Sequence, residues 1–311
     1  MNNLGLYLVS VLIWGSTWLA ITFQLGRVPP AVSVAYRFAL ASAMLFAWCG
    51  ARGLRLAYPW RAHAGMALQG ALLFGLNYVL VYLAEARLAS GLVALIFSLM
   101  VFVNIVAARL FLGTKIVPAT LTAAALGVSG VALVFWPEMA AGSGREHAWL
   151  GLAFALVSTV SASLGNIVAA RNQRRGLPVV QANAYGMAYG ALFVTLYALV
   201  MGRPFLFEAS AGYVLSLGYL ALFGSVLAFG AYLTLVGRIG ADRAGYTAAV
   251  VPIVAVLLST LFEGLRWHVT TFLGIALCLG GNVLVLRRKA AAAKPAATTH
   301  AGTTRSSPEK P

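Results

Sequence analysis

The feature that most constrains this chain is a series of ten apolar runs separated by short polar gaps. About 20 apolar residues in a helix cross the roughly 30 Å hydrocarbon core of a bilayer. The runs cover Leu4–Leu25, Ala31–Gly50, Gly65–Ala84, Ala89–Leu112, Val117–Trp136, Trp149–Ala170, Val179–Met201, Gly212–Val236, Ala244–Phe262 and Val269–Leu286. Only 9% of the residues are charged, against about a quarter in a soluble domain. The sequence therefore predicts an all-α integral membrane protein with ten transmembrane helices.

The basic residues indicate how these helices are oriented. With the N-terminus placed in the cytoplasm, 16 of the 22 Lys and Arg residues fall on the cytoplasmic side, five on the other side and Arg37 within a span. This asymmetry follows the positive-inside rule, and an odd number of spans would destroy it. We expect both termini in the cytoplasm, and the composition favours a bacterial inner (cell) membrane.

The two halves of the chain resemble each other. An ungapped shift of 151 residues lays Leu76–Leu133 on Leu227–Leu284. It pairs Arg87 with Arg238, Gly113 with Gly264, Thr120 with Thr271 and Gly130 with Gly281. Five spans are an odd number, so two consecutive copies enter the membrane in opposite directions. Inverted repeats are typical of transporters, with the substrate site between the halves.

Several segments resemble the EamA branch of the drug/metabolite transporter superfamily, over about residues 5–286. They are Leu12–Leu19 (LIWGSTWL), Tyr36–Leu45 (YRFALASAML) and two related helix-loop-helix segments, LFLGTKIVPATLTAAALGVSGVALV and LFEGLRWHVTTFLGIALCLGGNVLV. The resemblance implies a ten-helix carrier of small metabolites, amino acids or amphiphilic compounds. The chain departs from the family at Thr114 and Leu265, where a glutamate is usual, so we assign no role to those loops.

The repeats suggest a division of the chain into four parts. The first five-helix repeat covers residues 1–136, the loop between the repeats 137–147 and the second repeat 148–286. Residues 287–311 are rich in Ala, Thr, Ser and Pro and lack hydrophobic periodicity, which predicts a disordered cytoplasmic tail.

Arg37 is the first candidate for a substrate-binding residue, because a charge within a span is costly and marks a function by default. One interpretation is that Arg37 reaches back to the membrane interface through its long side chain. The other is that it faces a central cavity and pairs with a substrate carboxylate or a helix C-terminus. The sequence leaves both open.

Aromatic and amide side chains in the spans complete the candidate site. Aromatic faces bind amphiphilic or cationic ligands, and amides fix ligand orientation. The further candidates are Trp14, Trp18, Asn77, Tyr78 with Tyr82 one turn beyond it, Asn166, Tyr232 and Tyr246. Each could instead anchor or pack a helix, and we expect about a third of them to line the pathway. Pro252 interrupts the ninth span and is a candidate for a gating bend, although such kinks are also ordinary.

The acidic residues bear on ion coupling. All seven acids lie outside the middle of the spans. Glu85, Asp242 and Glu263 lie near span ends, each within three residues of an arginine, which predicts interfacial ion pairs. A buried carboxylate is the usual proton relay of coupled carriers. We therefore expect facilitated export or exchange rather than a proton-driven pump.

Other classes of protein fit the sequence less well. The formal charge of +15 is explained by helix orientation rather than by nucleic-acid binding. The four histidines are scattered, Cys49 and Cys278 lie in apolar runs, and neither a metal site, a cofactor site nor a catalytic cluster is predicted. The expected partners are the lipid bilayer and a small-molecule substrate, with the oligomeric state left open. We predict a non-enzymatic exporter of small metabolites such as amino acids or amphiphilic compounds; the alternatives are a membrane-embedded enzyme and a transporter-like sensor.

Overall fold

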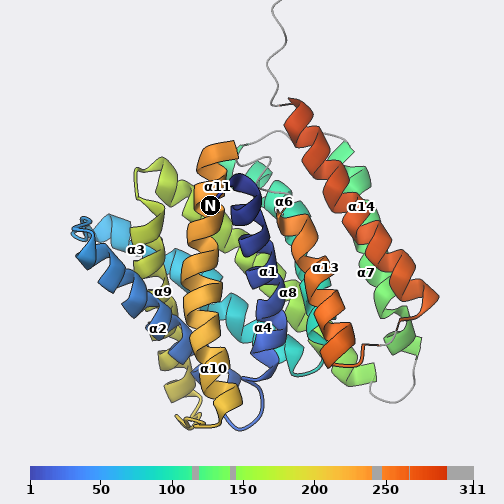
Figure 1. Ribbon diagram of the computed structural model, residues 1–311, viewed down its shortest axis with the longest axis horizontal. Helices are drawn as coiled ribbons and strands as arrows, with labels where there is room; N and C mark the ends of the chain where they lie inside the picture. Colours follow the sequence, from blue (N-terminus) through green and yellow to red (C-terminus); the bar gives the residue numbers. More distant parts are fainter. Residues whose placement is uncertain (114–118, 141–144, 240–246, 266, 293–311) are drawn as a thin grey trace, which may run out of the picture.

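A computed structural model describes residues 1–311 apart from 114–118, 141–144, 240–246, 266 and 293–311 (Figure 1). The helices of the first half are α1 (Asn3–Thr22), α2 (Pro30–Ala51), α3 (Trp60–Gln69), η1 (Gly70–Leu76), α4 (Asn77–Glu85), α5 (Ser90–Phe97), α6 (Met100–Leu112) and α7 (Ala119–Ala140). Those of the second half are α8 (Arg145–Arg174), α9 (Val179–Val200), α10 (Ala211–Tyr219), η2 (Leu220–Leu227), α11 (Ala228–Ile239), α13 (Thr247–Phe262) and α14 (Val269–Ala292).

These helices form the ten predicted spans. The segments α3, η1 and α4 make one span, α5 and α6 a second, and α10, η2 and α11 a third. Within the described chain, seven helices are long and apolar enough to cross a membrane. Three shorter apolar helices, Leu121–Pro137, Val250–Phe262 and Val269–Leu284, complete the set. The prediction of an all-α membrane fold of ten helices in two repeats is confirmed.

Three helices run further than the sequence predicted. Helix α7 continues to Ala140 and α8 begins at Arg145, so both extend into the predicted loop 137–147. Helix α14 continues to Ala292, past the predicted start of the disordered tail at residue 287. Ala, Arg and Lys are strong helix formers, so the helix does not end where hydropathy falls. The remainder of the predicted tail lies outside the described residues.

Equivalent helices of the two repeats make approximately equivalent contacts with the other repeat. Helices α2 and α9, the second spans of the repeats, pack together at one end of the long axis. Helices α7 and α14, the fifth spans, pack together at the other end (Figure 1). Between them, α1 packs against η2, α11 and α13, while α8 packs against η1, α4, α5 and α6. The first helix of each repeat thus contacts the third and fourth spans of the other repeat.

Individual residues of α7 and α14 show the same equivalence. A Cβ added at Gly130 would lie 2.5 Å from the carbonyl oxygen of Gly274, and one added at Gly281 would lie 2.6 Å from that of Ala123. The shift of 151 residues carries Gly130 onto Gly281 and Ala123 onto Gly274, so these two close approaches are equivalent. Small residues let helix backbones approach in this way.

We expect Gly130→Ala to lower the stability of the protein by about 1–3 kcal/mol, because the new methyl group meets backbone rather than a movable side chain. Gly280→Ala on α14 is the matched control, since a Cβ at Gly280 has no neighbour within 4 Å among the described residues. Thermal unfolding of both variants in the same detergent tests this. Equal melting temperatures would contradict the close packing of α7 on α14.

Both third spans are interrupted by a π-helix at the same place. The shift of 151 residues lays η1 (Gly70–Leu76) on residues 221–227, within η2 (Leu220–Leu227). π-Helical turns are rare and frequently occur at functional sites. Their recurrence extends the internal repeat N-terminal to Leu76, where the sequence alone did not reveal it.

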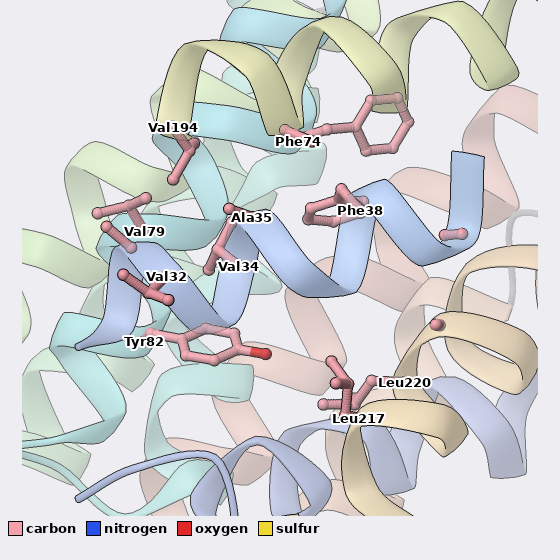
Figure 2. Packing of buried hydrophobic residues seen from close by; sticks show 14 of the residues in the cluster. Val32, Val34, Ala35, Phe38, Phe74, Val79, Tyr82, Val194, Leu217 and Leu220 are labelled. Carbon is pink, nitrogen blue, oxygen red and sulfur yellow. The ribbon is translucent and has the colours of Figure 1, made fainter. Parts of the chain in front are cut away.

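The interrupted spans pack on a core shared by the two repeats. Figure 2 shows Phe38 of α2 beside Phe74 of η1, with Tyr82 of α4 and Leu217 and Leu220 of the second repeat close by. The rings of Phe38 and Phe74 have centroids 5.3 Å apart. This core packs α2 against both α4 and η2, and Arg37 projects from α2 close to Gly224 of η2.

Candidate functional site

Arg37 is enclosed by the protein. Helix α2 begins at Pro30, a residue suited to the first helical position, and carries Arg37 two turns into the bundle. The side chain is 1% exposed. Its guanidinium lies 4.5 Å above the ring centroid of Tyr78 and 5.2 Å from that of Phe38. The structure thus selects the inward-facing alternative over the interfacial one.

The guanidinium of Arg37 keeps free donors. Its Nε and Nη1 atoms are buried and have no hydrogen-bond partner in the described part of the chain. On its other side, a Cβ added at Gly224 of η2 would lie 3.5 Å from Nη2. A buried N–H without an acceptor is costly, and such orphans in a native protein call for an explanation. A ligand that supplies acceptor oxygens would provide one.

Two further polar groups, on α4, lie within electrostatic reach of Arg37. Tyr78, Tyr82 and Glu85 are spaced by four and three residues and so share one face of the helix. The hydroxyl of Tyr82 is buried, within electrostatic reach of Arg37, and it points towards Leu217 and Leu220 (Figure 2). We call Arg37, Tyr78, Tyr82 and Glu85 the polar cluster.

Glu85 differs from the sequence prediction. An interfacial ion pair with Arg87 was expected, but Glu85 is only 6% exposed and neither carboxylate oxygen has a partner among the described residues. Arg87 is engaged elsewhere: its Nη1 donates to the carbonyl of Leu83 at 2.8 Å, and its guanidinium lies 5.0 Å from the ring of Phe154. The prediction was wrong because hydropathy places the end of a span at the interface, whereas the end of α4 is covered by neighbouring helices.

Glu263 is held by a structural contact between the repeats. Its carboxylate accepts from the backbone N–H of Ser90 at 3.1 and 3.2 Å, and from the hydroxyl of the same serine. Ser90 is the first residue of α5, where backbone N–H groups lack partners within the helix. Glu263 therefore caps a helix of the other repeat. Asp242, the third acid of this prediction, lies outside the described residues.

We expect Glu263→Ala to destabilise the protein by about 1.5–3 kcal/mol, because the charged acceptor of two donors is lost. Glu208→Ala is the control, since among the described residues Glu208 accepts from the nearby Ser210 alone, in an exposed segment. Chemical or thermal unfolding of the two variants decides the matter. A loss confined to Glu208→Ala would rule out the cap.

Trp14 and Tyr232, two of the predicted site residues, pack against each other. Among the described residues, the ring and hydrogen-bond contacts of Trp14 are with Tyr232, Phe229 and Gly224 rather than with Arg37. The rings of Trp14 and Tyr232 have centroids 5.2 Å apart, and Phe229 lies 5.3 Å from Trp14. The indole N–H of Trp14 donates to the carbonyl of Gly224 at 3.3 Å. Gly224 therefore lies between Trp14 and the polar cluster, and links the two groups of candidates through η2.

The remaining candidates make packing contacts. Trp18 stacks edge-on against Phe97 at 5.3 Å. Asn166 donates to the sulfur of Met100 at 3.4 Å. Asn77 donates to the carbonyl of Leu73, a residue of η1, and its own buried oxygen has no partner in the described chain. Trp18 and Asn166 make contacts between helices, the bond of Asn77 lies within its own span, and the predicted role of all three in binding stays a prediction.

Two candidates concern the ninth span. Tyr246 lies outside the described residues. Pro252 is buried within α13, near the crossing of this helix with α1, where a Cβ at Gly15 would lie 3.3 Å from the carbonyl oxygen of Val251. Its role in gating stays a prediction.

The structure thus joins Arg37 and Tyr78, which the sequence singled out, to Glu85, which it placed elsewhere. The spacing of Tyr78, Tyr82 and Glu85 was the available signal. The described residues contain no group of three or more metal-ligating side chains.

Comparison with known proteins bears on what such a bundle does. The profile of the EamA-like transporter family matches residues 3–136 and again residues 149–287. The chain is 29% identical over 276 residues to the "uncharacterized inner membrane transporter YedA" of Escherichia coli K12, covering 88% of this chain and 87% of that protein. It is 26% identical over 262 residues to the protein PagO of Salmonella typhimurium, covering 83% and 84%. A crystal structure with 18% identity, a TM-score of 0.66 and 91% coverage of this chain shares the fold.

Proposed function

Because the chain belongs to the EamA-like transporter family, we propose that it exports small metabolites, such as amino acids or amphiphilic compounds, by alternating access between its two repeats. The observation that carries the proposal is Arg37: a buried guanidinium stacked on Tyr78, whose Nε and Nη1 have no acceptor in the described part of the chain. Nothing about a purely structural role accounts for donors left without acceptors.

Arg37 is suited to a ligand with an anionic group. A guanidinium binds a carboxylate with paired hydrogen bonds, and these charge-assisted bonds are strong. The rings of Tyr78 and Phe38 flank the guanidinium and offer apolar surface for the remainder of the ligand. An amino acid or an amphiphilic carboxylate meets both requirements.

The paired π-helices support alternating access. Each π-helix lies against the first and second helices of the other repeat: η1 against α8 and α9, η2 against α1 and α2. Inverted repeats exchange conformations in carriers by rocking about a site between them. A π-helical turn has weaker local regularity than an α-helix and can accommodate a change of angle. We propose that η1 and η2 are the two hinges.

We place the protein in the inner membrane with both termini in the cytoplasm. The placement of the termini in the cytoplasm rests on the distribution of the basic residues between the two sides of the membrane. In agreement with a common side, α1 begins and α14 ends at the same edge of the bundle in Figure 1. The relative YedA is named an inner membrane transporter.

The two alternatives make different predictions. A membrane-embedded enzyme would convert a bound compound, and a transporter-like sensor would bind one without moving it. No specific feature of the described residues favours either alternative. One assay distinguishes both of them from a transporter.

The testing experiment is a ligand screen on the purified protein, followed by flux. Thermal unfolding is measured with amino acids, amphiphilic carboxylates, amphiphilic cations and nucleobase compounds. A ligand that binds the native state raises the melting temperature with concentration. The proposal predicts a hit among the compounds with a carboxylate, and release of that compound from proteoliposomes. Binding without flux would identify a sensor, chemical conversion would identify an enzyme, and a hit confined to cations would contradict the role of Arg37.

A further inference from the structure

Glu85 takes no part in the ligand binding proposed for Arg37. Its carboxylate is buried, and both oxygens lack a partner among the described residues. The contrast with Glu263 is informative, because that carboxylate accepts from both donors of Ser90. One acid is thus satisfied by the protein and the other is left open within a membrane span.

Few charged or titratable groups surround Glu85. Helix α4 packs against α1, α2, α5, α8 and η1. In the described parts of these elements, Arg37 of α2 is the charge within electrostatic reach, and Glu263 acts on Glu85 from beyond α13. Tyr82, on α4 itself, interacts electrostatically with both Arg37 and Glu85. Arg87 is directed to Phe154 and the Leu83 carbonyl instead.

The charges of the polar cluster allow two states. The guanidinium of Arg37 carries a positive charge. An ionised Glu85 balances that charge within the low-dielectric interior. A ligand anion bound to Arg37 would add a second negative charge, which the interior disfavours unless one proton is taken up.

We propose that Glu85 is a proton-exchange site, and that it takes up a proton when a ligand's anionic group binds Arg37. A proton from water on one side of the membrane forms an O–H bond with a carboxylate oxygen of Glu85, and the same bond breaks on the other side to return the proton to water. The anion and the proton then cross together. An anion leaving the cell down its own gradient carries a proton with it. The joint transport of anion and proton rests on the proposed function. The reversible protonation of Glu85 does not.

This changes the expectation drawn from the sequence. Facilitated export was expected because a buried acid was missing from the spans. Glu85 supplies such an acid. Export is still driven by the ligand's own gradient, but a proton is co-transported with the ligand.

Infrared difference spectroscopy tests the proton step directly on the full-length protein in lipid nanodiscs. We expect a carbonyl band of a protonated carboxyl group that grows as the pH is lowered, shifts in D2O and is missing from Glu85→Gln. Glu208→Gln, altered at a half-buried acid outside the helices, retains the band. A band of constant size over the whole pH range, or the same spectra for wild type and Glu85→Gln, would overturn the proposal.

Arg37→Gln tests the coupling without a ligand, because it removes the charge that a bound anion would neutralise. We expect the band to reach half its size at a higher pH, corresponding to at least about tenfold tighter proton binding. Arg37→Met serves the same purpose if the first variant does not fold. An unchanged midpoint would overturn the coupling. Failure of the ligand screen with a normal band would refute export and leave the proton site standing.

Discussion

Replacing Arg37 by glutamine weakens binding of the anionic ligand by roughly 30- to 150-fold. The estimate corresponds to about 2–3 kcal/mol for the hydrogen bonds of a charged donor. Arg37→Lys restores the charge but not the paired geometry, so it recovers only part of the affinity. Isothermal titration with the compound identified by the screen measures both.

The same substitution has an opposite effect on the protein without ligand. A buried charge with unused donors is costly, and Glu85 takes up a proton once that charge is removed, so the substitution is expected to raise the melting temperature of the free protein. Arg52→Gln is the control, since Arg52 is exposed at the end of α2 and lies over Trp48. It should leave affinity unchanged. A protein in which Arg37→Gln loses stability and keeps its affinity would make Arg37 a structural residue.

The second large effect is expected at Gly70, the first residue of η1. A Cβ there would collide with the carbonyl of Gly186 and would lie 3.0 Å from the backbone nitrogen of Gly190 on α9. Both are backbone atoms, so no rotamer change relieves the contact. Gly70→Leu therefore prevents the repeats from packing and abolishes the folded protein, at a cost above the usual 1–3 kcal/mol of overpacking.

The matched variant for this prediction is Gly218→Leu in α10, two residues before η2, where an added Cβ has no described neighbour within 4 Å. Gel filtration in detergent and thermal unfolding compare the two. Folding of Gly70→Leu with a normal melting temperature would show that α9 does not cross η1 as closely as described.

The fold could be predicted from the sequence because the bilayer constrains it strongly. Every backbone polar group within the membrane must be satisfied inside its own helix, so length and hydropathy locate spans well. The pairing of Gly130 with Gly281 also anticipated the equivalent glycine contacts of α7 and α14. Helix ends were less predictable, because α14 leaves the membrane without leaving the helical conformation.

The site was harder to predict, because its properties depend on contacts between helices. The sequence located Arg37 within a span, yet only the packing of Tyr78 and Gly224 around it shows that it faces inward. Glu85 was misplaced because its neighbour in sequence, Arg87, turns to Phe154 instead. The π-helices have no composition of their own: Gly70–Leu76 is an apolar run like the rest of its span.

The central claim is that the polar cluster is reached by water from each side of the membrane in turn. Thr17 lies beside it, because a Cβ at Gly224 would be 2.8 Å from Cγ2 of Thr17 and 3.5 Å from Nη2 of Arg37. Thr17→Cys is introduced after Cys49 and Cys278 are replaced by alanine, and a membrane-impermeant thiol reagent is applied to sealed vesicles of either orientation. Leu206→Cys, in the exposed segment before α10, serves as the control that labels from one side only. Alternating access predicts that Thr17→Cys is modified from both sides. Modification from one side only, or from neither, would contradict it.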